Sequence, residues 1–349
     1  MPVNSRSALL GPLLKSVSRS FWLTLRVLPA GMRDPVGLAY LLARAADTIA
    51  DTSLISPAQR LEFLLAFRAC VNGNGDGGAL ERIAVEVGRK QRDSSEKTLL
   101  ESLRPALTVL AQLEAGDREA VQGIVTTLTQ GMEFDLRTFP DESSGQLAAL
   151  EDYAELDRYT YLVAGCVGEF WTRMTWVHAP GAIGGEHERM LERGVRFGKA
   201  LQLTNILRDC GKDLRIGRCY LPSAILTRYG LAAGELLDAG NSGRARPMLF
   251  ELVRRDLDHY RAAMEYTLAL RRSTLRLRLA CVWPVLIGLE TMALLVRNEA
   301  WLDPAKASKI GRGRVYRIMV RSLLLARSNA MLRGWMEGLI RKVEAGMQG

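Results

Sequence analysis

Two segments of the chain carry a pair of aspartates at the same spacing. They are YLLARAADTIAD at residues 40–51 and LQLTNILRDCGKD at residues 201–213. The pairs are Asp47 with Asp51 in the first segment and Asp209 with Asp213 in the second. Residues four apart share one face of a helix, so each segment should present two carboxylates in one direction. Such oxygens suit a hard cation such as Mg²⁺.

Polar neighbours extend each pair of aspartates into a stripe on the same helix face. Tyr40 and Arg44 lie at helical spacing before the first pair, and Gln202 and Asn205 lie before the second. Arg208 adds a basic group beside the second stripe, where it could bind phosphate. Two such stripes in one chain are much less expected by chance than one.

The chemistry that fits such stripes is the ionisation of a diphosphate ester. Mg²⁺ between carboxylates and a diphosphate neutralises the leaving group as it departs. The carbocation left behind would need an apolar cavity that keeps water away. If the two stripes face each other across such a cavity, the residues indicate Mg²⁺-dependent ionisation of a prenyl diphosphate.

Four blocks of sequence resemble the signature blocks of the squalene and phytoene synthases. They are VSRSFWLTLRVLP (17–29), YLLARAADTIAD (40–51), DRYTYLVAGCVGEFW (157–171) and QLTNILRDCGKDLRIGRCYLP (202–222). The resemblance implies the all-α isoprenoid synthase fold (the class I terpenoid synthase fold) with a central cavity. It also implies head-to-head condensation of two farnesyl diphosphates through presqualene diphosphate, a cyclopropylcarbinyl diphosphate.

The resemblance also implies roles for single residues. The implied Mg²⁺ ligands are Asp47, Asp51, Asp209 and Asp213, with Asn205 beside them. The implied diphosphate-binding residues are Arg19, Arg44, Arg208 and Arg218, to which the stripes add Tyr40 and Gln202. Tyr159 matches a tyrosine proposed to transfer a proton or stabilise a cation, and Tyr161 is the alternative.

The last third of the chain bears on a reductive step. ACVWPVLIGLETMALLVRN (280–298) resembles a helix that lines the squalene synthase cavity, and SKIGRGR (308–314) resembles a basic segment assigned to cofactor binding. Lys309 and Arg312 are therefore candidates for the phosphates of NADPH, with Asn298 a weaker one. These features favour a squalene synthase. The last predicted helix is followed by no hydrophobic anchor of the kind eukaryotic squalene synthases carry, so the resemblance is expected to be greatest to the bacterial forms. A phytoene or dehydrosqualene synthase, or an enzyme that stops at presqualene diphosphate, stays open.

The elements that position these residues are predicted to be helices, in a single all-helical domain over residues 1–349. The predicted helices cover residues 96–113, 117–138, 146–178, 186–214, 244–271, 273–301 and 312–345. The helix with the first aspartate pair is predicted to begin with Asp34 as its N-cap and Pro35 as its first residue. Loops are predicted at residues 72–78, 239–247 and 303–314.

Composition narrows the class of protein and its location. The chain has 349 residues, 48% of them hydrophobic, and a net charge of +9. Five cysteines without CxxC spacing favour a reduced, cytoplasmic protein. The longest uninterrupted apolar stretch, residues 279–289, is shorter than the roughly 20 residues that a helical span needs, which predicts no transmembrane anchor. The basic C-terminal helix is expected to close the core, and peripheral contact with the inner face of a membrane is the second interpretation.

Two other functions fit part of the sequence. A basic helical protein could bind nucleic acid, but the arginines are dispersed and no helix-turn-helix pattern is present. We therefore expect no nucleic-acid partner. A class I terpene cyclase would pair an Asp-rich motif with an NSE-like motif, whereas both motifs here have the form DxxxD.

Overall fold

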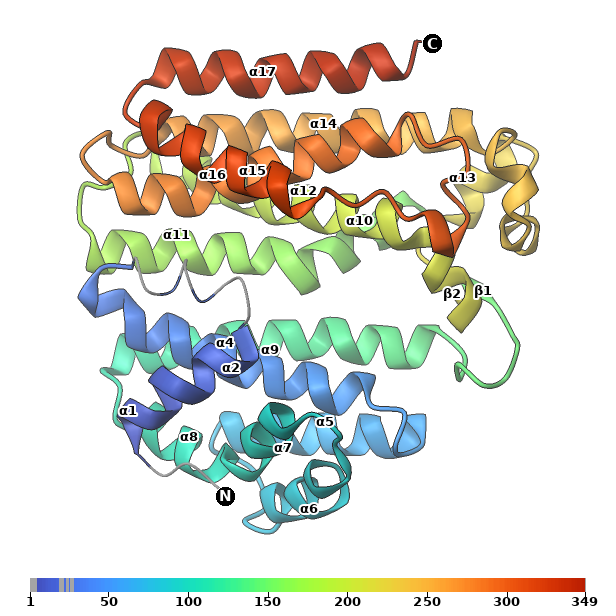
Figure 1. Ribbon diagram of the computed structural model, residues 1–349. Coiled ribbons are helices and arrows are strands. Elements are labelled where there is room, and N and C mark those ends of the chain that lie inside the picture. Colours follow the sequence, from blue (N-terminus) through green and yellow to red (C-terminus); the bar gives the residue numbers. More distant parts are fainter. Residues whose placement is uncertain (1–4, 19–21, 23–24, 26–27, 349) are drawn as a thin grey trace. The chain divides into compact units, whose positions relative to one another are not determined.

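The predicted all-α fold is confirmed by the computed structural model, which describes residues 5–18, 22, 25 and 28–348 (Figure 1). In these residues, extended structure is confined to two-residue strands and a single bridge. Strand β1 (Ala148–Ala149) pairs in parallel with β2 (Arg218–Cys219). The chain divides into two compact units, Met1–Arg137 with Val177–Ala179 and Thr138–Trp176 with Pro180–Gly349.

The first unit is built around one long helix, α4 (Ala30–Asp51), which carries the first aspartate pair. Side chains such as Leu38, Leu42 and Ile49 are fully buried along its inner face. The helices around it are α1 (Arg6–Ala8), η1 (Leu9–Leu13), α2 (Leu14–Ser18), α5 (Pro57–Val71), α6 (Ala79–Glu86), η3 (Gly88–Lys90), α7 (Ser94–Glu101), α8 (Leu103–Ala111) and α9 (Ala115–Thr138).

The predicted start of α4 is wrong. The helix begins at Ala30, after Pro29, so Asp34 and Pro35 lie inside it. A proline near the beginning of a helix removes only one main-chain hydrogen bond, so the helix can extend past it. Asp34 does not cap the helix but accepts a hydrogen bond from Arg6 Nε at 2.9 Å.

Two predicted helices are each divided in the structure. The segment 96–113 breaks at Ser102, three residues before Pro105, whose ring lacks an N–H for the preceding turn. The segment 312–345 becomes α16 (Arg312–Leu325) and α17 (Asn329–Gly346), and the Ser328 side chain caps the second helix.

The second unit holds the second aspartate pair on α12 (His187–Asp213), which packs along α14 (Arg246–Ala269). The other helices of this part of the chain are α10 (Tyr153–Thr160), η4 (Tyr161–Gly165), α11 (Cys166–His178), η5 (Leu214–Ile216), α13 (Ser223–Arg228), η6 (Ala233–Leu237), η7 (Ala239–Ser242), α15 (Leu275–Leu295) and η8 (Pro304–Lys306), with α16 and α17. The predicted helix over 146–178 therefore begins only at Tyr153, since β1 and a turn precede it. The predicted loops at 239–247 and 303–314 contain η7, η8 and the first turns of α14 and α16.

The most apolar helix of the second unit is α15. Among the described residues it is the one helix long and apolar enough to cross a membrane, but 78% of its most apolar window is buried inside the protein. Burial on nearly all sides is what a core helix requires. The apolar stretch at residues 279–289 lies within this buried helix.

Close backbone contact fixes the segment that carries the tyrosines against α12. A Cβ atom at Gly198 of α12 would lie 2.1 Å from the carbonyl oxygen of Ala164 in η4. A Cβ atom at Gly168 would lie 1.8 Å from the carbonyl oxygen of Gly194. Only glycine permits such an approach. The main chain of η4 and α11 therefore touches the helix that carries the second aspartate pair.

Candidate active site

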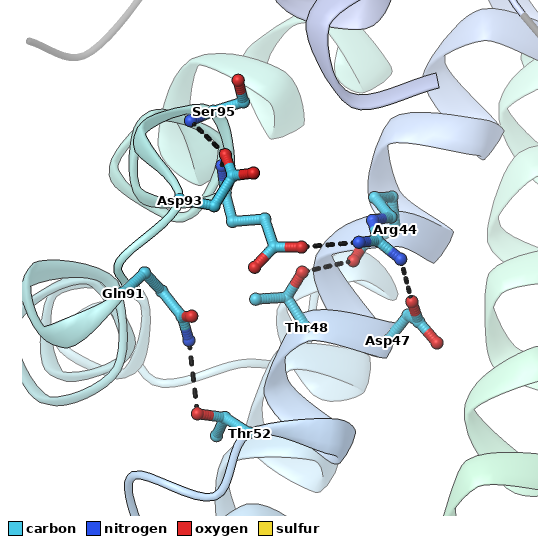
Figure 2. A network of polar contacts seen from close by, with 8 residues as sticks. Arg44, Asp47, Thr48, Thr52, Gln91, Asp93 and Ser95 are labelled. Atoms are coloured by element: carbon cyan, nitrogen blue, oxygen red, sulfur yellow. Dashed lines mark hydrogen bonds and ion pairs between the residues drawn. The ribbon is translucent and has the colours of Figure 1, made fainter. Parts of the chain in front are cut away.

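The first aspartate pair lies at the end of α4, with Arg44 one turn before it. The guanidinium of Arg44 donates to Asp47 Oδ2 and, at 2.5 Å, to Glu96 Oε1 of α7. Figure 2 shows Arg44 and Asp47 pointing toward each other from neighbouring turns of one helix. Tyr40, one turn earlier, contributes to the electrostatic environment of Arg44. The predicted stripe of Tyr40, Arg44, Asp47 and Asp51 is therefore present along α4.

Charge is crowded at this end of α4. Partial burial and the neighbouring carboxylate of Asp51 raise the pKa of Asp47 to about 6, although Arg44 acts in the opposite direction. Burial alone would lower the pKa of Arg44, but the carboxylates of Asp47 and Glu96 raise it. Two carboxylates that disfavour each other's ionisation form a site that a cation would stabilise.

Helix α7 supports Arg44 from outside the motif. Asp93 begins α7 as its N-cap and accepts hydrogen bonds from the backbone N–H groups of Ser95 (2.7 Å) and Glu96 (3.3 Å). The connection before α7 is tied to α4 by Gln91, which donates to Thr52 Oγ1 at 3.3 Å (Figure 2). Glu96 is a residue of the site that the sequence analysis missed. Its 52-residue separation from Arg44 leaves no periodic signal in the sequence.

The second aspartate pair lies on the last two turns of α12. Arg208 binds the carboxylate of Asp209 with two nitrogens, and its Nε donates to Oδ1 at 3.0 Å. Burial and the charge of Asp209 raise the pKa of Asp213 to about 7, despite nearby Arg218 and Arg208. Gln202 and Asn205 are half-buried on the preceding turns. The predicted second stripe is therefore also present.

A buried network supports α12 directly beneath this stripe. Thr204, next to Asn205, donates to Asp256 Oδ2 of α14 at 2.9 Å, and its Oγ1 lies 2.7 Å from the hydroxyl of Tyr260. Asp256 is fully buried, and this burial raises the pKa of its carboxyl well above the ordinary value. The sequence analysis did not identify Asp256. The sequence feature that could have identified it is an aspartate at a position of α14 where the helical pattern expects an apolar core residue.

Arg218 lies just after the second motif, in strand β2. Its guanidinium donates to Glu142 Oε1 at 3.1 Å, and the strand pairing places Ala148 opposite it. Arg218 therefore lies on the same unit as Asp213, and its charge partly opposes the rise in the pKa of that carboxyl. Arg19, the remaining predicted diphosphate-binding arginine, lies outside the described residues.

The two candidate tyrosines differ in environment. The ring of Tyr159 is only 4% exposed and stacks on Tyr220, with centroids 4.8 Å apart and planes 22° apart. Phe139 packs edge-on against Tyr220, so Tyr159 belongs to a buried aromatic cluster. Tyr161 instead donates to Glu169 Oε2 at 3.1 Å, and burial together with Glu169 raises its pKa. The segment that begins at Tyr161 is a π-helical turn, a feature that is frequent at functional sites.

The candidate cofactor residues lie on one connection of the second unit. The Asn298 side chain donates to the carbonyl of Lys306 at 2.8 Å and to Ser308 Oγ at 3.0 Å. Lys309 is exposed on the segment that follows, and Arg312 is exposed at the start of α16. Asn298 therefore holds the shape of the connection that carries Lys309. Hydrogen bonds of this kind, from a side chain to its own connection, are typical of a residue that positions its neighbours.

The donor set of each motif fits Mg²⁺ in part. Among the residues that the structure describes, no three Asp, Glu, His or Cys side chains converge on one point. Mg²⁺ in phosphate-transferring sites is commonly held by one or two carboxylates together with substrate phosphates and water. Each motif has two neighbouring carboxylates, one of them (Asp47 or Asp213) with a raised pKa, which matches that pattern. The remaining ligands would come from a diphosphate.

Comparison with known proteins gives the family. The family model described as squalene/phytoene synthase matches residues 14–314. A squalene synthase of Eremothecium gossypii is 27% identical over 311 residues, which cover 89% of this chain and 66% of that protein. The chain thus spans just under two thirds of that relative's length.

Solved structures show the same fold. The complex of TcSQS with the ligand E5700 has a TM-score of 0.75 and 23% identity, covering 99% of both chains. A dehydrosqualene synthase in complex with a ligand has a TM-score of 0.61 and 22% identity, covering 91% of this chain and 96% of the other. The family model over residues 14–314 confirms the resemblance indicated by the four sequence blocks. The chain belongs to the squalene/phytoene synthase family.

Proposed function

We propose that this chain is a Mg²⁺-dependent prenyltransferase that joins two farnesyl diphosphates head to head and reduces the product to squalene with NADPH. The observation that carries the proposal is the placement of both aspartate pairs. Each pair ends a long helix, with an arginine bound to one of its carboxylates. A second observation is membership in a family whose matched relatives include squalene synthases.

The aspartates and arginines would act on the diphosphate groups. When bound, Mg²⁺ would supply positive charge to the departing diphosphate. Asp47, Asp51, Asp209 and Asp213, with Asn205, would hold it. Arg44 and Arg208 already bind carboxylates of these motifs. Each could exchange a carboxylate for a diphosphate oxygen with charge-assisted hydrogen bonds.

Tyr159 would act at the carbon skeleton. Its ring is held in a fixed orientation by stacking on Tyr220. A buried aromatic face stabilises positive charge near it. The hydroxyl oxygen of Tyr159 would take up the proton that the rearranging skeleton loses, while its own hydroxyl proton passes to the departing diphosphate. Tyr161 would act less directly, because its hydroxyl is hydrogen-bonded to Glu169.

The reductive step depends on Lys309 and Arg312. Both are basic, exposed and close in sequence, as residues that bind the phosphates of a dinucleotide must be. Asn298 would position their connection rather than touch the cofactor, since its amide already binds Lys306 and Ser308. A single catalytic domain over residues 1–349 with a central apolar cavity, in the cytoplasm, completes the proposal.

A pair of incubations tests the proposal. Purified protein is mixed with farnesyl diphosphate and Mg²⁺, with and without NADPH, and the products are identified by mass spectrometry. Squalene with NADPH, and dehydrosqualene or hydroxysqualene without it, would support the proposal. The same product in both incubations would make the chain a dehydrosqualene synthase or an enzyme that stops at presqualene diphosphate. In a parallel incubation with geranylgeranyl diphosphate, turnover of this substrate but not of farnesyl diphosphate would make the chain a phytoene synthase.

A further inference from the structure

The outer face of α16 is apolar although it is open to solvent. Tyr316, Val320 and Leu324 follow one another at four-residue spacing and are 67%, 62% and 79% exposed. Leu323, beside them, is 53% exposed. Residues at this spacing form one continuous stripe along a helix. Single exposed apolar residues are ordinary, but a stripe of this kind marks an interaction surface.

The inner face of α16 is firmly seated on the second unit. Ile318 and Ser322 are buried, and Ser322 Oγ accepts a hydrogen bond from Trp283 Nε1 at 2.8 Å. The end of the helix is held by Arg278 of α15, which donates to the carbonyl of Ala326 at 2.7 Å. The helix therefore has a satisfied inner face, and the apolar stripe cannot be buried by a simple rotation. Figure 1 shows α16 beside α15 near the C-terminal end of the chain.

Basic residues flank the apolar stripe. The segment 312–327 has no acidic residue, and its arginines are Arg312, Arg314, Arg317, Arg321 and Arg327. Arg314 is paired with Glu290 at 2.5 Å, and Arg321 lies over the ring of Trp335, 4.4 Å from its centroid. A groove of about 580 Å³ runs beside the helix and is lined by Tyr316, Arg317, Val320, Arg321, Leu324 and Trp335 among others.

We propose that the outer face of α16 docks on the surface of an anionic lipid bilayer. The helix would lie in the plane of the interface. Tyr316, Val320 and Leu324 would enter the acyl boundary, and Arg317 and Arg321 would bind lipid phosphates. An apolar centre with basic flanks is the pattern of such interfacial helices. Long arginine side chains reach the headgroups while their stems stay on apolar surface.

Charge argues for lipid rather than a second copy of the chain. In a twofold symmetric dimer the same patch meets itself, so the arginines of one α16 would face those of the other. No acidic residue of the segment 312–327 could neutralise them. An anionic bilayer offers the opposite charge over the whole length of the helix. Helix α17 differs, because its apolar side chains Leu332, Met336 and Val343 are buried in the core.

Vesicle binding by the full chain tests the proposal. Sedimentation with large unilamellar vesicles is measured for phosphatidylcholine alone and for phosphatidylcholine mixed with phosphatidylglycerol. Binding to the anionic vesicles that falls as salt is added is expected. Equal binding to both vesicles, or no binding to the anionic ones, would overturn the proposal.

Two double variants separate the apolar and basic parts of the face. Val320→Ser with Leu324→Ser removes the apolar stripe and should weaken binding roughly 10-fold. Arg317→Gln with Arg321→Gln should weaken binding to the anionic vesicles by about 30-fold. Matched controls elsewhere are Leu54→Ser with Val177→Ser, and Arg89→Gln with Lys90→Gln, all at exposed positions. The controls should bind as the unaltered chain does.

A third measurement on the same proteins decides whether a lipid bilayer or a second copy of the chain covers the outer face of α16. Sedimentation velocity without lipid should give one oligomeric state for the unaltered chain and for both α16 variants. A change of that state in Val320→Ser with Leu324→Ser, with vesicle binding unaffected, would assign the face to a second copy and overturn the proposal. Thermal unfolding of each variant checks that the fold is intact. Prenyltransferase activity is measured separately, so its failure would leave the lipid result standing.

Discussion

At the scale of single residues, the site rests on two pairs of neighbouring carboxylates. The carboxyl groups of Asp47 and Asp213 have pKa values raised to about 6 and about 7, in each case by burial and then by the other aspartate of the pair. Arg44 and Arg208 bind one carboxylate of each pair but do not cancel both charges. A divalent cation would relieve the repulsion between the two carboxylates of each pair.

Asp47→Asn or Asp209→Asn should therefore remove a metal ligand while keeping the shape of the side chain. We expect the rate of product formation to fall at least ~100-fold, comparable to the loss of a strong electrostatic contact in the transition state. EDTA should abolish turnover, and added Mg²⁺ should restore it. Asp76→Asn, in an exposed loop of the first unit, is the matched control. Near-normal activity of both motif variants would rule out the role of the two motifs.

Tyr159→Phe should affect chemistry more than binding. The variant keeps the ring that stacks on Tyr220 and loses only the hydroxyl group. We expect a large fall in kcat with little change in KM, as for an interaction made mainly in the transition state. Tyr161→Phe breaks the hydrogen bond to Glu169 and should have the smaller effect. If steady-state kinetics show the reverse order, Tyr161 is the catalytic ring.

At the scale of elements, helix packing explains residues inside the motifs that have no chemical role. Gly211 lies between Asp209 and Asp213, and a Cβ atom there would lie 2.3 Å from the carbonyl oxygen of Leu302. The motif therefore contains a small residue because the chain before η8 crosses the end of α12. The crossing segment therefore packs against the turn of α12 that lies between the two aspartates.

Gly211→Ala should push α12 and the crossing segment apart. The free energy of unfolding is expected to fall by about 1–3 kcal/mol, the usual cost of overpacking. Gly123→Ala in the middle of α9 is the control, because nothing lies within 4 Å of its Cβ position. That substitution should be neutral or stabilising by up to about 1 kcal/mol. Urea denaturation of both variants measures the difference, and equal stability would show that the crossing can yield.

The connection between α15 and α16, with the first residue of α16, contains Lys309 and Arg312, the residues proposed to bind NADPH for the reductive step. Replacing Lys309 and Arg312 with Ala removes two exposed positive charges and leaves the Asn298 hydrogen bonds in place. We expect a higher KM for NADPH and a shift of product toward dehydrosqualene or hydroxysqualene, while presqualene diphosphate still forms. Chromatography of both half-reactions provides the measurement. An unchanged KM for NADPH would place the cofactor elsewhere.

At the scale of the whole molecule, sequence periodicity was enough to place α9 and α12. The predicted spans 117–138 and 186–214 agree with α9 and α12 to within two residues. The break between α16 and α17 has no proline or glycine to mark it. It is stabilised instead by Arg278, which is fully buried and donates to the carbonyl of Ala326 and to Asn329 Oδ1. A contact over 48 residues leaves no local pattern.

The same distinction holds for the candidate site. Four-residue spacing predicted both stripes correctly, because a helix fixes which side chains share a face. The partners Glu96, Glu142 and Asp256 come from other helices and connections, so only the fold brings them to Arg44, Arg218 and Thr204. Sequence spacing therefore predicted which residues share a helix face, but not which residues of other elements contact them.

The buried Asp256 should leave its mark on the stability of the molecule. Burial raises the pKa of its carboxyl well above the ordinary value, so the folded chain keeps a proton that the unfolded chain releases. Its contribution to stability is complete below the unfolded pKa of about 4 and is lost as the pH rises toward the folded value. Relative to Asp256→Asn, the unaltered chain should lose up to about 1.4 kcal/mol per pH unit in that range.

The unaltered chain must be compared with Asp256→Asn because a second buried group changes the stability with pH in the opposite direction. Burial lowers the pKa of His259 to about 4, so its contribution is lost as the pH falls below about 6.5. This effect is common to both proteins and cancels in their difference. Urea denaturation between about pH 5 and about pH 8 gives the difference, with the exposed Glu188→Gln as a control. The opposite outcome is that the free energies of unfolding of the unaltered chain and of Asp256→Asn differ by an amount that does not change with pH. That result would mean that Asp256 is ionised in the folded chain and that a positive charge near it balances the carboxylate beneath α12.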